Sequence, residues 1–298
     1  MQFLLLCAGT ALARSTHALI VGVSGYGSYP ALHADHDVAE ISRVLVEQGA
    51  DERNVHILAD QVATGARGTR LPGVPERAKM LEAIDSLARR VSGGDAAVLH
   101  FSGHGVQVRD DGDDETDGYD EALVPIDGTS DAATLVRDDD LRVRIDAIRR
   151  QLGPTGHLLV TVDSCHSGTA TRGGRTTRGG LPPIGESARG TSARPDRGPD
   201  LEQDASTGLA PYVLIAAAQS NERSEEVVGQ DGVAMGALSR ALSTLIPAAA
   251  GRADYGALAE DVRRAFRAEG LAQRPQIEGD AARAVLSGQP VWLSLIHI

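Results

Sequence analysis

The chain has 298 residues, of which 42% are hydrophobic and 23% are charged, as expected for a globular protein with a full core. Its formal net charge is −12 and its aromatic content is 3%, and both values argue against a nucleic-acid partner. No apolar run reaches the roughly 18 residues that cross a bilayer, so the sequence predicts no membrane span.

The two cysteines, Cys7 and Cys165, exclude a disulfide framework and zinc sites built from four cysteines. Cys7 lies in a leader, residues 1–15, whose apolar stretch ends in Ala11-Leu12-Ala13 and suits signal-peptidase cleavage, although the usual basic start is missing. A first strand or a disordered leader is the alternative. With a signal peptide the protein would be exported to the periplasm or secreted, and without one it would be cytoplasmic.

Apolar runs and segments of helical periodicity alternate from residue 16 onward. The runs predict buried strands at residues 17–23, 54–58, 96–101, 157–162 and 212–217. Apolar residues at helical spacing predict helices over residues 38–45, 80–91, 141–152, 235–246 and 255–266. This alternation predicts an α/β protein with a mostly parallel central sheet sandwiched between helices.

Residues 168–209 interrupt the alternation, because they are rich in Gly, Arg, Ser, Thr and Pro and lack apolar periodicity. We interpret them as a long mobile loop. The loop would divide one domain into a larger part, residues 16–167, and a smaller part, residues 210–290.

Two predicted strands end in residues suited to catalysis. The third strand runs into SGHG, residues 102–105, and the fourth runs into DSCHSG, residues 163–168. If these strands are neighbours, His104 can take the proton of the Cys165 thiol and later protonate a leaving amine. The backbone amides of Gly105 and Cys165 would then form an oxyanion hole.

Asp163 lies two residues before Cys165, so both side chains point to one face of a strand. A carboxylate beside the nucleophile disfavours the thiolate, and a cationic substrate side chain next to it explains its presence best. Arginine fits a carboxylate with two parallel hydrogen bonds, which predicts cleavage after arginine. The alternative is that Asp163 only accepts a structural hydrogen bond from a loop.

Together, SGHG and DSCHSG resemble the metacaspases, relatives of the caspases, and we expect a bacterial type. Further similar segments are HALIVGVSGY, DDETDGYDEALVP, LVRDDDL, YVLIAAAQSNERSEE, GVAMGALSRAL and RPQIEG, so that the resemblance covers about residues 16–285. It implies the caspase-hemoglobinase fold, a Cys-His dyad, cleavage of peptides or proteins after Arg or Lys, and an acidic pocket formed by Asp37, Ser102 and Asp163. We expect the protein to be a monomer.

The resemblance also implies activation by calcium (Ca2+), with ligands at the positions of Asp120, Asp138 and Asp139. One acid usual in the family, seven residues after the cysteine, is replaced here by Arg172. The alternative for residues 138–140 is a role in opening a helix.

Six arginines in residues 168–209 make this loop a candidate substrate for an enzyme that cleaves after arginine. They are Arg172, Arg175, Arg178, Arg189, Arg194 and Arg197. Self-cleavage after one of them is therefore expected. The alternative is a solvated loop whose arginines only balance the acidic remainder.

Three other functions remain open. The chain could be a caspase-like module that binds partners without catalysis, or a peptidase of the same fold that cleaves after asparagine. It could also be a metal-dependent hydrolase, whose ligands would be His33, Asp35, His36 and Asp37. The same four residues suit the opening of a helix, where acids interact favourably with the helix dipole.

Overall fold

A computed structural model describes residues 14–109, 119–164, 176–178, 184, 208–219 and 222–286. The leader up to residue 13, the nucleophile Cys165 and most of the predicted loop lie outside the described residues. Arg14 and Ser15, which we assigned to the leader, are held against the main fold. The Arg14 guanidinium donates to the carbonyl of Gly94 at 2.6 Å, and the Ser15 amide donates to the carboxylate of Asp95 at 3.1 Å.

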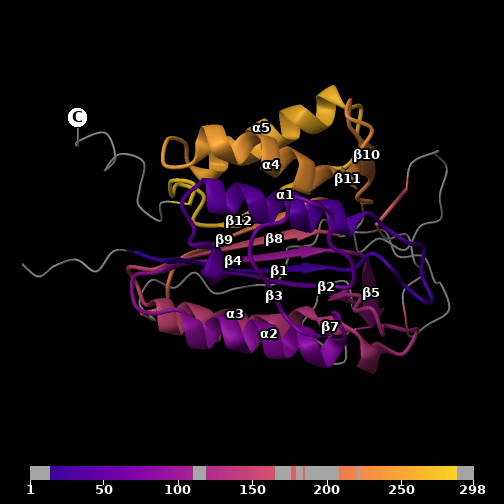
Figure 1. The fold of residues 1–298 in the computed structure, drawn as a ribbon, viewed down its shortest axis with the longest axis horizontal. Coiled ribbons are helices and arrows are strands. Elements are labelled where there is room, and N and C mark those ends of the chain that lie inside the picture. The colour runs from indigo at the N-terminus through magenta and orange to yellow at the C-terminus, as the bar shows by residue number, and fades with distance from the viewer. Residues whose placement is uncertain are drawn as a thin grey trace, which may run out of the picture.

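The centre of the described structure is a seven-stranded sheet with the order β12-β9-β8-β4-β1-β2-β3 (Figure 1). Its parallel strands are β1 (Thr16–Gly22), β2 (Val55–Ala59), β3 (Thr69–Arg70), β4 (Ala96–Ser102), β8 (His157–Asp163) and β9 (Tyr212–Ala216). The edge strand β12 (Gln276–Gly279) runs antiparallel to β9. The five strands predicted from apolar runs are confirmed to within one residue at each end. Neither β3 nor β12 was predicted, because neither contains a buried apolar run.

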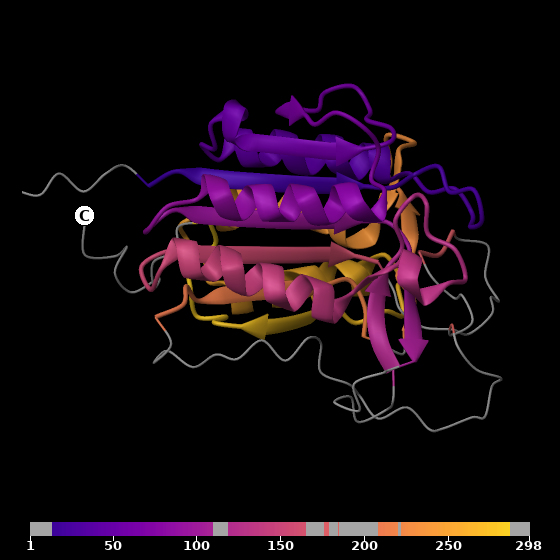
Figure 2. The ribbon, with the colours of Figure 1, turned by 90° about the horizontal axis from the view of Figure 1, so that it is seen from below.

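Helices cover both faces of this sheet, as the sequence predicted (Figures 1 and 2). One face carries α1 (Ala34–Glu47), α4 (Ala237–Ala249) and α5 (Tyr255–Ala268), and the other carries α2 (Arg77–Arg90) and α3 (Asp138–Leu152). The alternation of side chains along β1 separates two cores, since Ile20 packs toward α1 while Leu19 and Val21 pack toward α2. Two single 3-10 turns, Glu52–Asn54 and Ala132–Thr134, complete the helical segments described.

Two small sheets, both absent from the sequence prediction, lie at the end of the molecule where the parallel strands end (Figure 1). The first consists of β5 (Gly105–Arg109), β6 (Tyr119–Leu123) and β7 (Val136–Arg137). The second is the hairpin of β10 (Glu226–Val228) and β11 (Ala234–Gly236). These sheets begin or end directly at residues of the candidate site, so they determine how it is closed.

Among the described residues, no helix combines the length and the apolar composition that crossing a membrane requires.

Candidate active site

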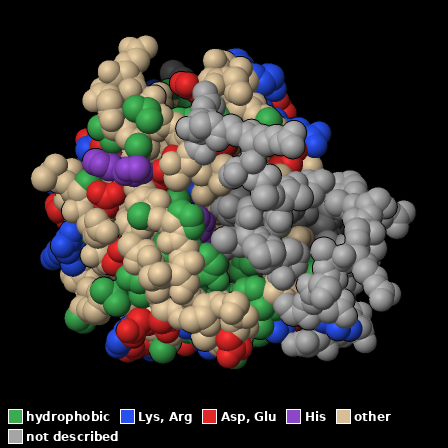
Figure 3. Space-filling model, turned by 90° about the vertical axis from the view of Figure 1, so that its right-hand side faces the viewer, with side chains coloured by type: hydrophobic (Ala, Val, Ile, Leu, Met, Phe, Trp, Pro, Cys, Tyr) green, Lys and Arg blue, Asp and Glu red, His purple; other side chains and the backbone are tan. Residues whose placement is uncertain are grey.

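The two motif-bearing strands are neighbours, which is the condition under which the sequence allowed His104 and Cys165 to act together. β4 and β8 pair in parallel, and the register brings Ser102 opposite Asp163 at their carboxyl ends. His104 lies two residues after Ser102, and Cys165 lies two residues after Asp163, with the buried Ser164 between them. Cys165 lies outside the described residues, so the separation between its thiol and the imidazole is not part of the described geometry. Figure 3 looks onto this end of the molecule, where charged and histidine side chains reach the surface.

His104 is buried, with 1% of its surface exposed. Its Nε2 lies 2.9 Å from the carbonyl oxygen of Pro30, which can only accept, so Nε2 carries the proton. The lone pair is then on Nδ1, which has no hydrogen-bond partner among the described residues. Burial lowers the pKa of His104, so the imidazole is neutral near pH 7 and able to accept a proton.

Two tyrosines hold the imidazole of His104 in place. The Tyr26 and Tyr29 rings lie with their centroids 4.8 Å and 5.9 Å from the imidazole, and the Tyr26 hydroxyl accepts the backbone N–H of His104 at 2.8 Å. A Cβ at Gly103 would lie only 2.6 Å from that hydroxyl, which explains the glycine before the histidine. Sequence analysis missed both tyrosines, because nothing in their local sequence indicates a contact with a residue so far along the chain.

The predicted pocket residues Asp37, Ser102 and Asp163 are brought together, and all three are wholly buried. Asp37 comes from the first turn of α1, while Ser102 and Asp163 end the paired strands. The Ser102 hydroxyl donates to the Asp37 carboxylate at 2.5 Å. A fourth residue, Glu226 at the start of β10, adds a carboxylate that sequence analysis did not assign to the pocket.

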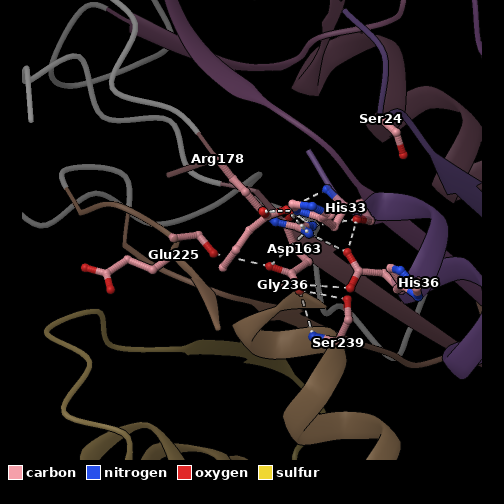
Figure 4. Close-up of polar contacts among 12 residues, drawn as sticks. Ser24, His33, His36, Asp163, Arg178, Glu225, Gly236 and Ser239 are labelled. Carbon is pink, nitrogen blue, oxygen red and sulfur yellow. Dashed lines mark hydrogen bonds and ion pairs between the residues drawn. The ribbon is translucent and has the colours of Figure 1, made fainter. Parts of the chain in front are cut away.

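The guanidinium of Arg178 fills this pocket (Figure 4). Its Nη1 donates to the Ser102 hydroxyl at 2.5 Å and lies 4.0 Å from the Asp163 carboxylate. Its Nη2 lies 2.5 Å from the Asp37 carboxylate and 3.0 Å from that of Glu226. No part of Arg178 is exposed. One of the six loop arginines therefore lies where the side chain of a substrate was expected.

The start of α4 forms a wall of the pocket and holds Asp163. Both the backbone N–H and the hydroxyl of Ser239 donate to the Asp163 carboxylate at 2.7 Å. The N–H of Gly236 donates to Asp37 at 2.9 Å. A Cβ at Gly236 would overlap the Asp163 carboxylate and lie 2.6 Å from the guanidinium carbon of Arg178, so only glycine leaves room for the cation.

Three buried carboxylates, those of Asp37, Asp163 and Glu226, lie close together in the pocket. The pKa of Asp37 is raised to about 6, mainly by burial; the Arg178 guanidinium opposes this rise, and the nearby Asp163 adds to it. Burial alone would lower the pKa of Arg178, but Asp37, Asp163 and Glu226 together raise it. Three carboxylates around one guanidinium mean that this site favours a bound cation.

The residues of the alternative metal centre, at and just before the start of α1, do not form one group, and His33 and His36 lie apart (Figure 4). Asp37 faces the pocket, His33 donates from Nδ1 to Glu226 at 2.7 Å, and His36 lies 3.8 Å from Asp35. Nowhere in the described part of the chain do three or more His, Cys, Asp or Glu side chains form a group that could hold a metal.

The expected calcium ligands Asp120, Asp138 and Asp139 do not form such a metal-holding group either. The buried Asp120 is paired with Arg137 at 3.1 Å, and Asp139 is paired with Arg142 at 2.6 Å. Asp138 opens α3 and accepts the N–H of Asp139 at 2.9 Å. As arranged, these three carboxylates do not by themselves make up a calcium site. The acid-rich residues 110–118 and Arg172 lie outside the described residues.

Comparison with protein families gives a match to a model described as the metacaspase, peptidase C14 domain, over residues 16–172. Curated relatives include metacaspase III c of Phaeodactylum tricornutum, 33% identical over 53% of this chain and 44% of the relative. They also include metacaspase-1 of Yarrowia lipolytica, 37% identical over 51% of this chain and 31% of the relative. The chain thus spans less than half the length of these relatives.

Solved structures share the fold along most of the chain. Caspase-1 from Spodoptera frugiperda matches with a TM-score of 0.53 and 13% identity, covering 93% of this chain and 91% of its own. A Geobacter sulfurreducens protein matches with a TM-score of 0.60 and 23% identity, covering 90% of this chain and 94% of its own. These matches confirm the predicted caspase-like fold.

Proposed function

Since the chain belongs to the metacaspase family, peptidase C14, we propose that it is a cysteine endopeptidase that cleaves peptide bonds after arginine, and less readily after lysine. Cys165 is the nucleophile and His104 the base in this proposal. The alternatives, cleavage after asparagine or binding without catalysis, require a different pocket or the loss of a reactive residue.

The observation that carries the proposal is the guanidinium of Arg178 in the pocket of Asp37, Ser102, Asp163 and Glu226. Its two terminal nitrogens are bound from different sides, which a planar guanidinium allows and the point charge of a lysine ammonium does not match. An aspartate or asparagine side chain would bring a negative or neutral group among three carboxylates. The pocket therefore favours arginine, then lysine, and rejects aspartate.

The geometry of His104 suits a base. With the proton on Nε2 bound to Pro30, the free lone pair on Nδ1 can accept the thiol proton of Cys165 and later deliver it to the leaving amine. The N–H of Gly105 donates to the carbonyl oxygen of Arg178 at 3.3 Å. When a substrate arginine replaces Arg178 in the pocket, the same N–H can donate to the carbonyl oxygen of the substrate. It would stabilise the negative charge that develops on a substrate carbonyl.

Hydrolysis of an arginine peptide measured from pH 5 to pH 8 tests the pocket. With a guanidinium in the pocket the pKa of Asp37 is about 6, and without that cation Asp37 takes up a proton more readily. KM is therefore expected to fall as the pH rises from about 6 upward, because binding the substrate cation no longer has to displace a proton from Asp37. The fall of kcat at low pH reports the protonation of His104 separately. In Asp37→Asn, KM should be higher and nearly independent of pH. Identical pH profiles of KM in the two proteins would contradict this role of Asp37.

Calcium stimulation is a further part of the proposal, and it is supported only by the resemblance. Asp120, Asp138 and Asp139 would hold the ion, and Asp120 would have to release Arg137 to do so. We expect millimolar calcium to bind to Cys165→Ala in a calorimeter and to raise the activity of the wild type. Both effects should be lost in the double variant Asp138→Ala/Asp139→Ala. Full activity in excess chelator would count against calcium.

Self-cleavage between residues 168 and 209 completes the proposal. The two fragments should stay associated after the cut, because β8 and β9 lie on either side of this segment in the sequence and pair with each other in one sheet. The six arginines are equivalent as far as the sequence goes, and of the six Arg178 lies within the described residues.

A further inference from the structure

The segment Thr176–Arg178 lies in the site as a short extended strand. The amide of Glu226 donates to the Thr176 carbonyl, and the amide of Arg178 donates to the Ser224 carbonyl, both at 2.9 Å. Between these two bonds, Thr177 forms an antiparallel bridge with Glu225. Pairing of an extended peptide with the edge of a strand is a common way for proteins to bind peptides, and it fixes the register of the peptide residue by residue.

In this register both the side chain and the carbonyl oxygen of Arg178 contact the site. Its guanidinium occupies the acidic pocket, and its carbonyl oxygen accepts the N–H of Gly105 at 3.3 Å. The side chain and the carbonyl of one residue thus lie at the two positions that the proposed function assigns to a substrate. None of the other five loop arginines falls within the described residues.

We propose that Arg178–Gly179 is the bond at which the chain cuts itself, and that the uncut chain keeps its own arginine pocket closed to other substrates. This inference rests on the proposed function. It adds the identity of the bond that is cut, and a resting state in which Arg178 occupies the pocket. Binding of Arg178 and of a substrate arginine exclude each other, because both need the same wholly buried pocket.

The cleavage step follows the proposed chemistry. His104 takes the proton from the Cys165 thiol, and the thiolate sulfur forms a bond to the carbonyl carbon of Arg178. The C–N bond to Gly179 then breaks, and the proton passes from the imidazole to the leaving amine. Water hydrolyses the thioester, which leaves a carboxylate on Arg178 and restores the thiol.

The closed state is favoured by the shortness of the tether. Residues 166–177 alone separate Cys165 from Arg178 in the sequence. Short tethers give effective concentrations of about a millimolar, roughly a thousand times the concentration of a substrate supplied at about a micromolar. An uncut chain should therefore hydrolyse arginine peptides only after a lag, during which Arg178–Gly179 is cut.

The test compares wild type with Arg178→Ala, and Arg175→Ala serves as a matched control three residues earlier in the same loop. Wild type and Arg175→Ala should yield a fragment that begins at Gly179, detected by mass spectrometry, and the lag in peptide hydrolysis should match its appearance. Arg178→Ala should yield no such fragment and should hydrolyse the peptide without a lag. Arg178→Lys, which keeps a cation, should restore the lag.

A binding measurement avoids dependence on cleavage. In the Cys165→Ala background, 4-aminobenzamidine, an aromatic amidine that imitates a guanidinium, should bind at least about 10-fold more tightly when Arg178→Ala is added than when Arg175→Ala is added. Equal affinities, together with hydrolysis by wild type that starts at once while Arg178–Gly179 is intact, would overturn the inference and leave the proposed function standing. Tighter binding without hydrolysis of any arginine peptide would instead refute the proposed function and support the closed pocket.

Discussion

Replacing Cys165 by alanine is expected to abolish the hydrolysis of arginine peptides, and replacing His104 by alanine is expected to reduce it by about 10²–10⁴-fold. The thiol has to lose its proton before it attacks, and among the described residues at this end of β4 and β8 the imidazole of His104 is placed to accept it. Without that imidazole the small thiolate fraction of an unassisted cysteine would have to react, and the leaving amine would lack its acid.

The variant His56→Ala is a suitable control, because His56 lies on β2 and its ring contacts the Arg53 carbonyl. It should retain nearly full activity. Alkylation of Cys165 by iodoacetamide at pH 7 gives a second readout, which should be slower in His104→Ala than in wild type because less thiolate is present. A His104→Ala protein with half the wild-type activity would contradict the assignment of the base.

A methyl group added at Gly236 is expected to lower kcat/KM for arginine peptides by about 10²-fold or more, mainly through KM. The new Cβ would lie 2.6 Å from the guanidinium carbon of Arg178 and nearer still to the Asp163 carboxylate, both closer than van der Waals contact allows. The backbone has little room to move away, because α4 begins at the next residue. Disrupting a buried, hydrogen-bonded charge pair typically costs about 2–5 kcal/mol, which corresponds to this loss.

Comparison with lysine peptides separates a pocket effect from general damage to the fold. A lysine side chain is narrower at the place that the new methyl group would fill, so Gly236→Ala should lose less activity toward lysine than toward arginine peptides. Gly93→Ala is the matched control, since a Cβ at Gly93 meets no atom within 4 Å. Equal losses on both substrates, or a kcat/KM for arginine within threefold of wild type, would show that Gly236 does not shape the pocket.

The sheet could be predicted because its central strands are continuous apolar runs buried on both faces, as in β1 and β8. The alternation with helices predicted a mostly parallel sheet, but the order of its strands and the register that brings Ser102 opposite Asp163 come from the structure. The small sheets were missed, since β10 and β11 have only three residues each and their burial comes from contacts with distant segments.

The same reason explains which site residues were missed. Glu226 reaches the pocket through a hairpin, and Tyr26 reaches His104 from the loop after β1, so neither contact leaves a local pattern in the sequence. Arg178 looked like any of six loop arginines. The fold shows its role, because it buries the Arg178 side chain among carboxylates that lie far from it along the chain.

The most direct test of the central claim is hydrolysis of four fluorogenic peptides that differ only in the residue before the cleaved bond: arginine, lysine, aspartate or asparagine. Wild type and Cys165→Ala are assayed side by side with and without calcium. We predict that wild type, after its lag, cleaves the arginine peptide fastest and the lysine peptide more slowly, that it leaves the aspartate and asparagine peptides intact, and that Cys165→Ala cleaves none. Efficient cleavage after aspartate or asparagine, or arginine cleavage that survives in Cys165→Ala, would contradict the account.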